Sequence, residues 1–548
     1  MHVIRSKFKG ASGKYYETVL LRESYREGKK VKKRTVANLT HCSEDEIVAI
    51  EIALKHKANL KGMISQGPCS TKEGMSVGGV WVIYQMAQRL GIVDALSNSK
   101  KGQLALWQVI ARVLEQGSRL SSVRLSETYA IASVIGLKGG FNEENLYKNL
   151  AWLTQNQAKI ENKLFSKKFP SGVLPNLFLY DVTSSYLEGD KNELADWGYN
   201  RDKKRGKKQI VIGMLSDENG MPVSTEVFKG NTQDTATFAS QIQKAKERFR
   251  CKKVTFVGDR GMIKSGQIED LQAAGFHYIT ASTKAQIETL LKNGIIQMSL
   301  FDNTLAEVQE SGVRYIFRRN PVRAQEIICS RSSKLSSIEK LVAKQNVYLA
   351  EHSKAQLKTA LKAVEEKIAR LGLKGWLTVC AQGRVLSLHT DEEKKTEEGK
   401  LDGCYVLRTD LTVEEAHFNV VHDRYKDLAM VESTFRTEKS NLDLRPIYVR
   451  TEESTRGHVL VVMLAYMIMK ALDNAWERLY LTVEEGIRSL STLTLLEATF
   501  DNGSAFQYIP EPRKQNQLML EALDIKLPKI LPKNNAHVVT RKPRRKPS

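Results

Sequence analysis

The sequence predicts an α/β protein: a mixed β-sheet with helices, interrupted by a large insertion and preceded by a helical N-terminal region. Three observations predict it. Apolar residues recur at helical spacing from about residue 43 to 166, strand-like and helical segments alternate from about 174 to 283, and a long charged segment separates these from later helices. Hydrophobic residues make up 41% of the 548 residues and charged residues 27%, which is typical of a folded chain with several domains.

The first predicted element is a β-hairpin over residues 15–36, because two strand-like runs flank Glu27-Gly28-Lys29. Its second arm carries the cations Lys29, Lys30, Lys32, Lys33 and Arg34. Both a solvated sheet edge and a DNA contact are consistent with this arm. Helices are predicted next, at Glu44–Leu60, Val80–Leu90, Ala105–Gln116 and Ser126–Ile135. They indicate a small helical domain, either a plain bundle or one that places a helix in a DNA groove.

The segment from 174 to 283 predicts the sheet. Strands are expected at Leu177–Leu187, Gln209–Leu215, Val223–Phe228, Val254–Val257 and His277–Ala281, and helices at Thr235–Phe249 and Ser265–Ala274. Short turns such as Asp217-Glu218-Asn219-Gly220 join the first three strands, which predicts a meander. Three strands, a helix, a strand, a helix and a strand form the RNase H-like arrangement.

The predicted insertion covers residues 284–420. It has a strand at Val313–Arg318, a long charged helix at Ser337–Leu371 and strands at Trp376–Cys380 and Val385–Leu388. Trp376 is read as a core residue, with stacking on a DNA base as the alternative. Helical periodicity returns at Asp423–Lys439 and Thr455–Leu479, and the apolar run Val459–Met469 is too short for a bilayer, so we expect a buried helix.

These elements give the predicted domain organisation. A basic hairpin region covers 1–40, a helical DNA-binding region 41–170, an RNase H-like catalytic core 171–283 and 421–480, the insertion 284–420, and a C-terminal region 481–548 that ends in a disordered basic tail over 541–548. The N-terminus lacks the apolar core of a secretory signal, and the six cysteines form no CxxC or Cys/His cluster. A cytoplasmic protein without a membrane partner is expected.

The charge balance points to a polyanionic partner. Lys and Arg number 84 against 62 Asp and Glu, a formal net charge of +22. A field of this sign attracts nucleic acid.

Two acids follow predicted strands in the same way. Asp181 follows Leu177–Tyr180, and Asp259 follows Val254–Gly258. In open α/β sheets the ligand site lies at the carboxyl ends of strands beside a topological switch point, here between the first and fourth strands, so both acids should face one crevice. Close carboxylates repel each other unless a divalent cation neutralises them, and oxygen ligands suit Mg²⁺ or Mn²⁺. Taken singly, each aspartate also fits a turn or a helix cap.

A third acid lies on the returning helix. Tyr425, Glu432 and Lys439 are seven residues apart, so successive positions differ by only about 20° and form one stripe. Leu428, Val431 and Phe435 form the neighbouring packing face. The stripe is suited to present Glu432 to a metal and Lys439 to a phosphate; a surface stripe without function is the alternative.

With these residues the chain resembles bacterial insertion-sequence transposases of the DDE class, in the insertion-sequence-four superfamily. The similarity rests on the Tyr…Glu-x6-Lys spacing, on Asp181 in LFLYDVTSSYLEG and on Asp259 in VTFVGDRGMI, and it covers roughly residues 170–475. The family has Arg three residues after the Tyr, where this chain has Leu428, a departure that affects one phosphate contact and not the acids.

The resemblance implies a function and its residues. Asp181, Asp259 and Glu432 would bind two divalent ions, Mg²⁺ or Mn²⁺, and catalyse strand cleavage at transposon ends and strand transfer into target DNA. Tyr425 and Lys439 would contact the transposon end. The expected partners are double-stranded DNA, as inverted-repeat ends and as target, and a second copy of the chain in a homodimeric DNA complex; the protein would associate with the nucleoid.

Further DNA contacts are expected from basic residues near these acids. The loop between the first two strands carries Lys203, Lys204, Arg205, Lys207 and Lys208, and Arg436 and Arg445 lie on or just after the catalytic helix. Such a loop is long enough to follow a DNA backbone, although a flexible solvated loop is also consistent. Two other functions share these features: an RNase H-like metal-dependent nuclease that does not join strands, and a catalytically inactive DNA-binding derivative.

Overall fold

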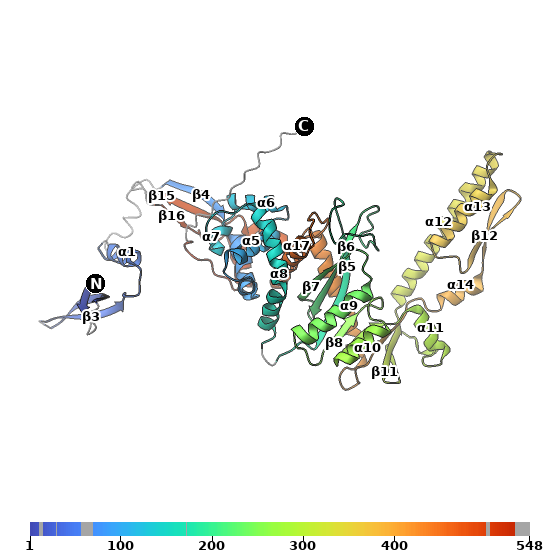
Figure 1. Ribbon diagram of the computed structural model, residues 1–548, viewed down its shortest axis with the longest axis horizontal. Coiled ribbons are helices and arrows are strands. Elements are labelled where there is room, and N and C mark those ends of the chain that lie inside the picture. Colours follow the sequence, from blue (N-terminus) through green and yellow to red (C-terminus); the bar gives the residue numbers. More distant parts are fainter. Residues whose placement is uncertain (10–14, 29, 56–69, 171–172, 500–504, 532–548) are drawn as a thin grey trace. The chain divides into compact units, whose positions relative to one another are not determined.

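The computed structural model describes residues 1–531, apart from 10–14, 29, 56–69, 171–172 and 500–504. The chain forms two compact units, Met1–Gly74 with Leu495–Pro510, and Met75–Thr494 with the chain from Glu511 (Figure 1). Lys29, the end of the predicted first helix at 56–60 and the basic tail at 541–548 lie outside the described residues.

The first unit contains an antiparallel sheet of β1 (His2–Lys9), β2 (Tyr15–Glu27) and β3 (Lys30–Asn38), followed by α1 (Glu44–Lys55). The predicted hairpin is confirmed as β2 and β3, and its turn contains Gly28 with φ +61°, a conformation that glycine adopts without strain. β1 is an additional strand. β3 is an exposed edge strand, and two of its cations pair with glutamates of β2: Lys32 with Glu27 and Arg34 with Glu23.

A second small sheet in the order β16-β15-β4 brings together β4 (Ser70–Ser76), β15 (Thr494–Thr499) and β16 (Ala505–Tyr508). Segments from opposite ends of the sequence therefore pair in it. β15 and β16 are antiparallel, with Leu496 opposite Tyr508.

The second unit begins with helices. They are α3 (Gly78–Arg89), α4 (Ile92–Leu96), α5 (Lys100–Leu114), α6 (Arg119–Arg124), α7 (Ile131–Ile135) and α8 (Glu143–Lys168). The prediction of a helix over Ser126–Ile135 is wrong in its first half, where a 3₁₀ turn at Leu125–Glu127 precedes α7. α8 is an additional long helix, and its start at Asn142 is stabilised by a capping box with Asn145.

These helices share one core with α17 (Glu452–Trp476), which packs against α3, α5 and α8. A Cβ at Gly457 would lie 2.2 Å from the Leu150 carbonyl oxygen, so α17 and α8 approach too closely for any larger residue. The chain over Glu452–Leu479 is long and apolar enough to cross a membrane by composition, but 72% of its most apolar window is buried within the protein. The predicted buried helix is therefore confirmed.

The large sheet has eight strands in the order β10-β11-β14-β9-β8-β5-β6-β7. The five predicted strands are β5 (Leu177–Tyr186), β6 (Gln209–Asp217), β7 (Pro222–Phe228), β8 (Thr255–Gly258) and β9 (His277–Ala281). β5, β6 and β7 form the predicted antiparallel meander, whereas β5 pairs with β8, and β8 with β9, in parallel. Helices α9 (Asp234–Gln243) and α10 (Ser265–Ala274) connect the later strands.

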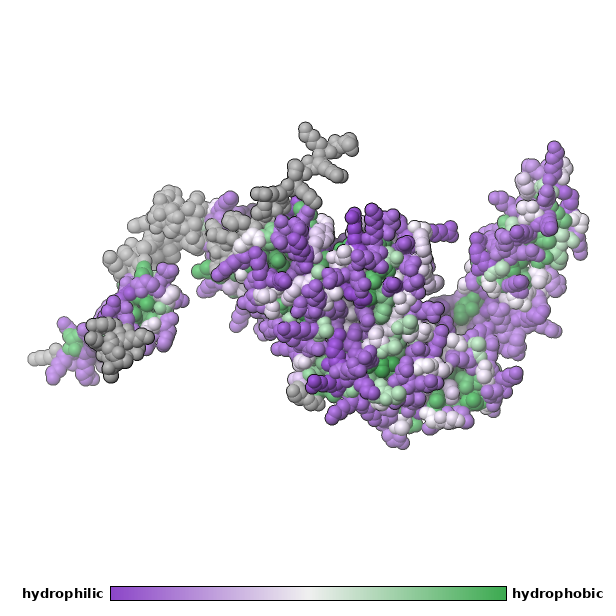
Figure 2. Space-filling view, in the orientation of Figure 1, coloured by the Kyte–Doolittle hydropathy of each residue, from purple (hydrophilic) through white to green (hydrophobic). Residues whose placement is uncertain are grey.

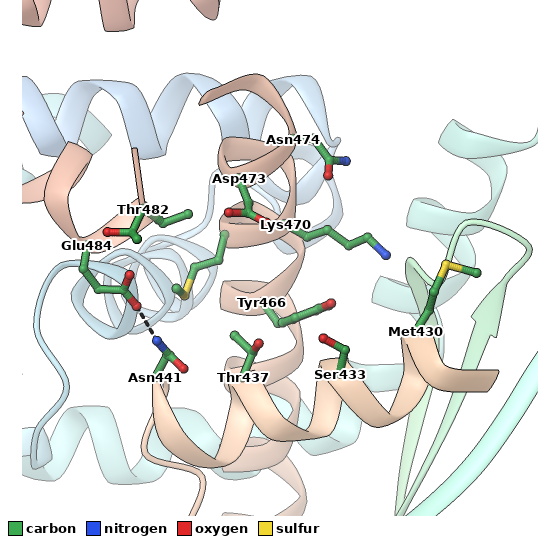
Figure 3. Close-up of a pocket in the computed structure, with 12 residues that line it drawn as sticks. Met430, Ser433, Thr437, Asn441, Tyr466, Lys470, Asp473, Asn474, Thr482 and Glu484 are labelled. Atoms are coloured by element: carbon green, nitrogen blue, oxygen red, sulfur yellow. Dashed lines mark hydrogen bonds between the residues drawn. The ribbon is translucent and has the colours of Figure 1, made fainter. Parts of the chain in front are cut away.

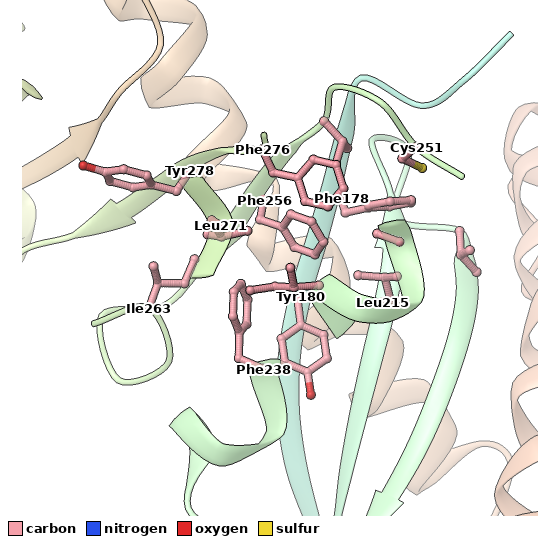
Figure 4. Packing of buried hydrophobic residues seen from close by; sticks show 14 of the residues in the cluster. Phe178, Tyr180, Leu215, Phe238, Cys251, Phe256, Ile263, Leu271, Phe276 and Tyr278 are labelled. Atoms are coloured by element: carbon pink, nitrogen blue, oxygen red, sulfur yellow. The ribbon is translucent and has the colours of Figure 1, made fainter. Parts of the chain in front are cut away.

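The two faces of β5 have different neighbours. Phe178 and Tyr180 point into an aromatic core with Phe238 of α9 and Phe256 of β8 (Figure 4). Because side chains alternate along a strand, Asp181 points to the opposite face. α16 (Leu428–Ser440) contacts β5 there, and α17 contacts β7. The sheet therefore lies between two helical layers, with Asp181 facing α16.

The predicted insertion is more closely joined to this sheet than expected. β10 (Ala306–Glu310), β11 (Val313–Arg319) and β14 (Cys404–Thr409) extend the sheet beyond β9, because β14 pairs with β9. The remaining elements are α11 (Lys284–Lys292), α12 (Pro321–Glu351), α13 (Leu357–Arg370), β12 (Leu377–Gln382), β13 (Val385–Thr390) and α14 (Glu392–Gly399). α15 (Phe418–Lys426), α18 (Val483–Leu490) and α19 (Lys514–Ala522) complete the unit.

The prediction of one helix over Ser337–Leu371 is wrong. α12 and α13 form a hairpin, because this fold lets the apolar stripe of α12, with Ile338 and Val342, bury itself against that of α13, with Val364 and Ile368. Trp376 is 2% exposed in the same core, which confirms the core interpretation over base stacking. The visible surface of the molecule is mostly hydrophilic (Figure 2).

Candidate active site

Asp181 and Asp259 lie at adjacent positions of the parallel pair β5 and β8. Tyr180 of β5 pairs with Gly258 of β8, and the residues that follow these two are Asp181 and Asp259. The prediction that both acids end a strand is wrong for Asp181, because β5 continues to Tyr186. β5 is held past Asp181 by antiparallel pairing with β6, whereas β8 stops at Gly258. The acids therefore meet where β8 ends alongside a strand that continues.

Local backbone contacts orient both carboxylates. Asp181 Oδ1 accepts a hydrogen bond from the Val182 amide at 2.8 Å, and Asp259 Oδ1 accepts one from the Arg260 amide at 2.7 Å. The Tyr425 hydroxyl also donates to Asp259 Oδ1, at 3.4 Å. A residue predicted to contact DNA thus lies against one of the acids in the protein without DNA.

Glu432 is brought to these acids by α16. The predicted single helix Asp423–Lys439 is wrong at one point: α15 ends at Lys426 and α16 begins at Leu428. The Met430 amide bonds the Asp427 carbonyl three residues back, which tightens the chain at this junction. Leu428, Val431 and Phe435 are buried as the predicted packing face.

The charges of the three acids are coupled. Burial, together with the negative charges of Glu432 and Asp259, raises the pKa of Asp181 to about 7, although its bond from the Val182 amide and the charge of Arg201 oppose the rise. Burial, followed by the charge of Asp259, raises the pKa of Tyr425. Three acids from β5, the end of β8 and α16 therefore share one electrostatic site.

The raised pKa of Asp181 has a measurable consequence for stability without metal. An acid whose pKa is higher in the folded state stabilises the fold while protonated, and this stability is lost as pH rises from about 4 through 7. Asp181→Asn should therefore raise the free energy of unfolding in EDTA, and more at pH 8 than at pH 5. The shift sets an upper limit of about 4 kcal/mol, and partial exposure makes the gain smaller.

Denaturant unfolding at the two pH values measures this difference. Asp190→Asn is the matched control, because Asp190 is an exposed aspartate on the loop after β5. Equal effects of the two variants at both pH values would show that Asp181 is not held near its neighbours in this way.

The three acids have the ligand chemistry of a divalent-metal site, but their carboxylates do not converge on a common position. Among the residues that the structure describes, no three His, Cys, Asp or Glu side chains are close enough together to hold a metal ion. Asp259 and Glu432 are exposed, so their side chains are free to change rotamer. The mutual repulsion that raises the pKa of Asp181 is what a bound cation would remove.

A second cluster lies next to the acids and is centred on Asp202, whose side chain is 2% exposed. Asp202 Oδ1 accepts from Lys439 Nζ at 2.9 Å and from Arg445 Nη1 at 2.7 Å, and Oδ2 accepts from the Tyr186 amide at 3.2 Å. Lys439 is 9% exposed. Two residues predicted to contact DNA phosphate therefore share an internal carboxylate partner, which the sequence analysis does not name.

Arg201 provides a cation beside the acids. Its Nη2 donates to both oxygens of Asp234 at 2.8 Å, and its amide donates to Ser184 Oγ of β5 at 3.0 Å. Arg201 and Asp202 thus anchor the loop between β5 and β6 with inward side chains. Asp202 is the one acid within the cationic run Arg201–Lys208, and this isolation is the sequence signal that it forms ion pairs.

The rest of this loop is a basic surface. Lys203, Lys204 and Arg205 are exposed, and the Lys204 ammonium lies 5.6 Å from the centre of the Tyr186 ring. Lys207 pairs with Glu188 at 2.6 Å, and Lys208 is partly buried. Arg436 is exposed on α16. Trp197 and Tyr199, further residues of the loop, are 58% and 81% exposed, and Arg201 lies over the Tyr199 ring at 5.7 Å.

Close backbone packing at Gly198 fixes the path of the β5–β6 loop before its cationic residues begin. A Cβ at Gly198 would lie 2.1 Å from the Gly230 carbonyl oxygen, so the loop must have glycine there to pass against the end of β7. Tyr199, Arg201, Asp234 and Gly261 then line a pocket of about 470 Å³. A Cβ at Gly261 would lie 3.8 Å from Asp234 Oδ2 and 3.9 Å from Asp259 Oδ2, which places the pocket beside the acids.

The opposite face of α16 lines a different pocket, of about 300 Å³ (Figure 3). Ser433 and Thr437 of α16 and Asn441, directly after it, face this pocket, and Tyr466 and Lys470 face it from α17. Asn441 bonds Glu484 across one end. Around the helix, Glu432 lies about 100° from Ser433 and about 140° from Thr437, and it is not among the residues that line this pocket, so the pocket is separate from Glu432.

Comparisons with known proteins agree with this geometry. Residues 174–468, more than half of the chain, match the family model described as a transposase DDE domain, and residues 4–66 match the N-terminal domain of IS1634 family transposases. No curated protein sequence matches the chain.

Two solved structures show weak likeness. A piggyBac transposase synaptic complex with hairpin DNA is similar with a TM-score of 0.35 and 10% identity, over 71% of this chain and 69% of that one. A Mos1 transposase paired-end complex with the left transposon end has a TM-score of 0.14 and 13% identity, over 33% of this chain and 58% of that one.

The match to the transposase DDE domain spans every element that carries the acids, from β5 through α16. This domain defines enzymes that cut and join DNA with divalent metal ions. The chain belongs to the DDE transposases of insertion sequences, and it is a DNA transposase.

Proposed function

We propose that this transposase cleaves DNA strands at the inverted-repeat ends of its element and transfers them into target DNA, with Asp181, Asp259 and Glu432 as the catalytic acids. The observation that carries the proposal is the placement of these three acids: β5 and β8 put Asp181 and Asp259 at adjacent positions, and α16, which carries Glu432, packs against β5. We assign the sheet to the RNase H-like type, because β7-β6-β5-β8-β9 has the expected order and directions. The Tyr425, Glu432 and Lys439 spacing supports the insertion-sequence-four superfamily.

The three carboxylates fit a pair of Mg²⁺ or Mn²⁺ ions. Carboxylate oxygens are the ligands that these ions prefer, and the repulsion at Asp181 favours binding of positive charge. When bound, two such ions activate the attacking oxygen and stabilise the leaving oxygen of an in-line displacement at phosphorus.

The chain's own residues prepare this site. The Val182 and Arg260 amides hold the Asp181 and Asp259 carboxylates in place, and Tyr425 donates a further hydrogen bond to Asp259. Asp181 must lose its proton to bind a cation, so its raised pKa makes metal affinity increase with pH. Through its hydrogen bond to Asp259, Tyr425 links the junction between α15 and α16 to the acid at the end of β8.

DNA would approach over the basic loop and α16. Lys203, Lys204 and Arg205 are exposed and free to follow a phosphate backbone, and Arg436 adds a cation on the helix that carries Glu432. Lys207 and Lys208 are proposed as weaker contacts, since Lys207 already pairs with Glu188 and Lys208 is partly buried. Lys439 and Arg445 would meet the transposon end from their positions on Asp202. A homodimer in the DNA complex would place two ends side by side.

The test is a reaction with a plasmid that carries the reading frame and the DNA flanking it. With Mg²⁺, the purified protein should nick or cut at the element ends and join the released 3′ ends to a second plasmid, and EDTA should stop both reactions. The alternative is a nuclease of the same fold, which would cut without joining. Cleavage products without any joined product, under conditions where the ends are cut, would decide for the nuclease.

A further inference from the structure

A pocket in the helical part of the second unit contains two buried arginines that form no carboxylate ion pair with any residue that the structure describes. Arg112 of α5 and Arg119 of α6 are 5% and 6% exposed, and His458 of α17, at 6%, lies with them. They line a pocket of about 200 Å³, well above the roughly 30 Å³ that one water molecule occupies in the liquid.

The polar contacts of these arginines leave their charge uncompensated. Arg119 Nη2 donates to His458 Nδ1 at 3.1 Å, and Arg112 Nη2 donates to the Gly117 carbonyl at 3.3 Å. Arg119 Nε is buried and has no hydrogen-bond partner in the described part of the chain. Burial and the positive charge of Arg112 lower the pKa of Arg119 to about 9, and burial lowers the pKa of His458 well below its usual value.

Asp443, an exposed acid that lines the pocket, opposes the fall that burial causes in the pKa of Arg112. Burying an unpaired charge costs several kcal/mol, so two adjacent guanidiniums with one exposed acid are expensive to keep without a ligand. An anion in the pocket would remove this cost. Guanidinium groups bind phosphate well, because their planar donors match its oxygens.

The pocket is physically connected to the catalytic region. Its far wall is the segment that follows α16, with Asp443, Pro446 and Tyr448. In the same segment Ile447 pairs with Leu187, directly after β5, the strand that carries Asp181. Tyr448 is 72% exposed beside the pocket and offers an aromatic face to a sugar or base.

We propose that Arg112 and Arg119 form a phosphate site that binds one phosphodiester group of the DNA, away from the three acids. The inference rests on the proposed function in one respect, because the phosphate belongs to the DNA that this transposase processes. Arg119 supplies its free Nε, and neutral His458 keeps the guanidinium in place by accepting from Nη2. The site would hold the flank of the DNA while the acids act on the scissile phosphate.

The experiment measures binding without cleavage. Full-length protein in EDTA is titrated with a fluorescent duplex taken from the DNA flanking the reading frame, at several salt concentrations, and thermal midpoints are recorded without DNA. The variants are Arg119→Gln, which removes the charge but keeps a polar side chain of similar stem length, and Arg124→Gln, a matched control at an exposed arginine of the same helix. Arg119→Gln should weaken binding about tenfold and reduce the log-log salt slope by about 0.9, the value for one phosphate.

The thermal midpoint separates a ligand site from a structural role. Removing an unpaired buried charge should leave the midpoint of Arg119→Gln equal to or above that of the wild type, whereas loss of a structural arginine would lower it. A lowered midpoint together with weak binding, or an affinity and salt slope equal to those of Arg124→Gln, would overturn the proposal. If Arg119→Gln does not fold, Arg112→Gln is judged by the same criteria.

A third measurement distinguishes the source of the phosphate. Inorganic phosphate is added to the DNA-free protein at constant ionic strength, and it should raise the midpoint of the wild type more than that of Arg119→Gln. If this difference is found while the DNA affinity of the variant is unchanged, the pocket binds free phosphate and the DNA assignment is wrong. Because these readouts need no catalysis, a wild type that binds DNA but never joins strands would contradict the proposed function and leave this site intact.

Discussion

Asp181→Asn and Asp259→Asn should each lower DNA cleavage by about 10³-fold or more, which corresponds to roughly 4 kcal/mol of transition-state stabilisation, while DNA binding is retained. Each change removes one anionic ligand from the site at which β8 ends beside β5. The amide of Asn keeps the shape of the side chain but not its charge, so the site loses affinity for divalent ions. The basic loop and the Asp202 cluster do not depend on these carboxylates.

The measurement is a time course of plasmid nicking with Mg²⁺, together with the affinity for end-containing duplex in EDTA. Asp190→Asn, on the exposed loop after β5, serves as the control and should behave as wild type. Folded Asp181→Asn or Asp259→Asn protein with near wild-type cleavage would refute the assignment of the acids. A loss of DNA binding as large as the loss of cleavage would mean that the substitution disturbs more than the metal site.

Glu432→Gln and Lys439→Ala should separate chemistry from end binding on one helix. Glu432 is exposed and coupled to Asp181, so Glu432→Gln should stop both nicking and strand transfer, with at best weak recovery in Mn²⁺. Lys439 is buried against Asp202, so Lys439→Ala should instead weaken binding of the transposon end more than binding of random duplex. Lys439→Arg should retain more activity than Lys439→Ala, since it keeps the charge.

The structure adds an effect on stability to this comparison. Removing one partner of a buried ion pair costs about 3–5 kcal/mol, and the loss should be smaller here because Arg445 still pairs with Asp202. The double variant Asp202→Asn with Lys439→Ala removes the buried carboxylate as well, so it should recover stability without recovering end binding. Urea unfolding and end binding of both variants test this. If the double variant regains full end binding, Lys439 acts on the fold and not on DNA.

The local elements were predictable where sequence pattern and burial act over a few residues. The strands from β5 to β9 and the helices α9 and α10 follow from apolar runs between turns, and their order predicts the sheet. The helical hairpin α12 and α13 was not predictable as such, because apolar periodicity continues through the chain between them and only packing of one stripe on the other reveals the bend. β14 joins the sheet through pairing with β9, more than 100 residues earlier, which no local pattern reports.

The candidate site shows the same division. Asp181, Asp259, Glu432, Tyr425 and Lys439 are identifiable from strand ends, helical spacing and family resemblance. Asp202 and the buried pair Arg112 and Arg119 are not, since their meaning depends on which charges lie beside them after folding.

The sequence by itself therefore determined the class of protein, the three candidate acids and the positive net charge, because these depend on residue types at short spacings and on composition. Only the tertiary structure decided which charges are free. It paired Lys439 and Arg445 with Asp202, left Lys203 to Arg205 exposed, and buried Arg112 and Arg119 without a carboxylate ion pair in the described part of the chain. The physical reason is that the interaction energy and the pKa of a charged group depend on its burial and its partners. Both are set by residues that lie hundreds of positions apart in the chain.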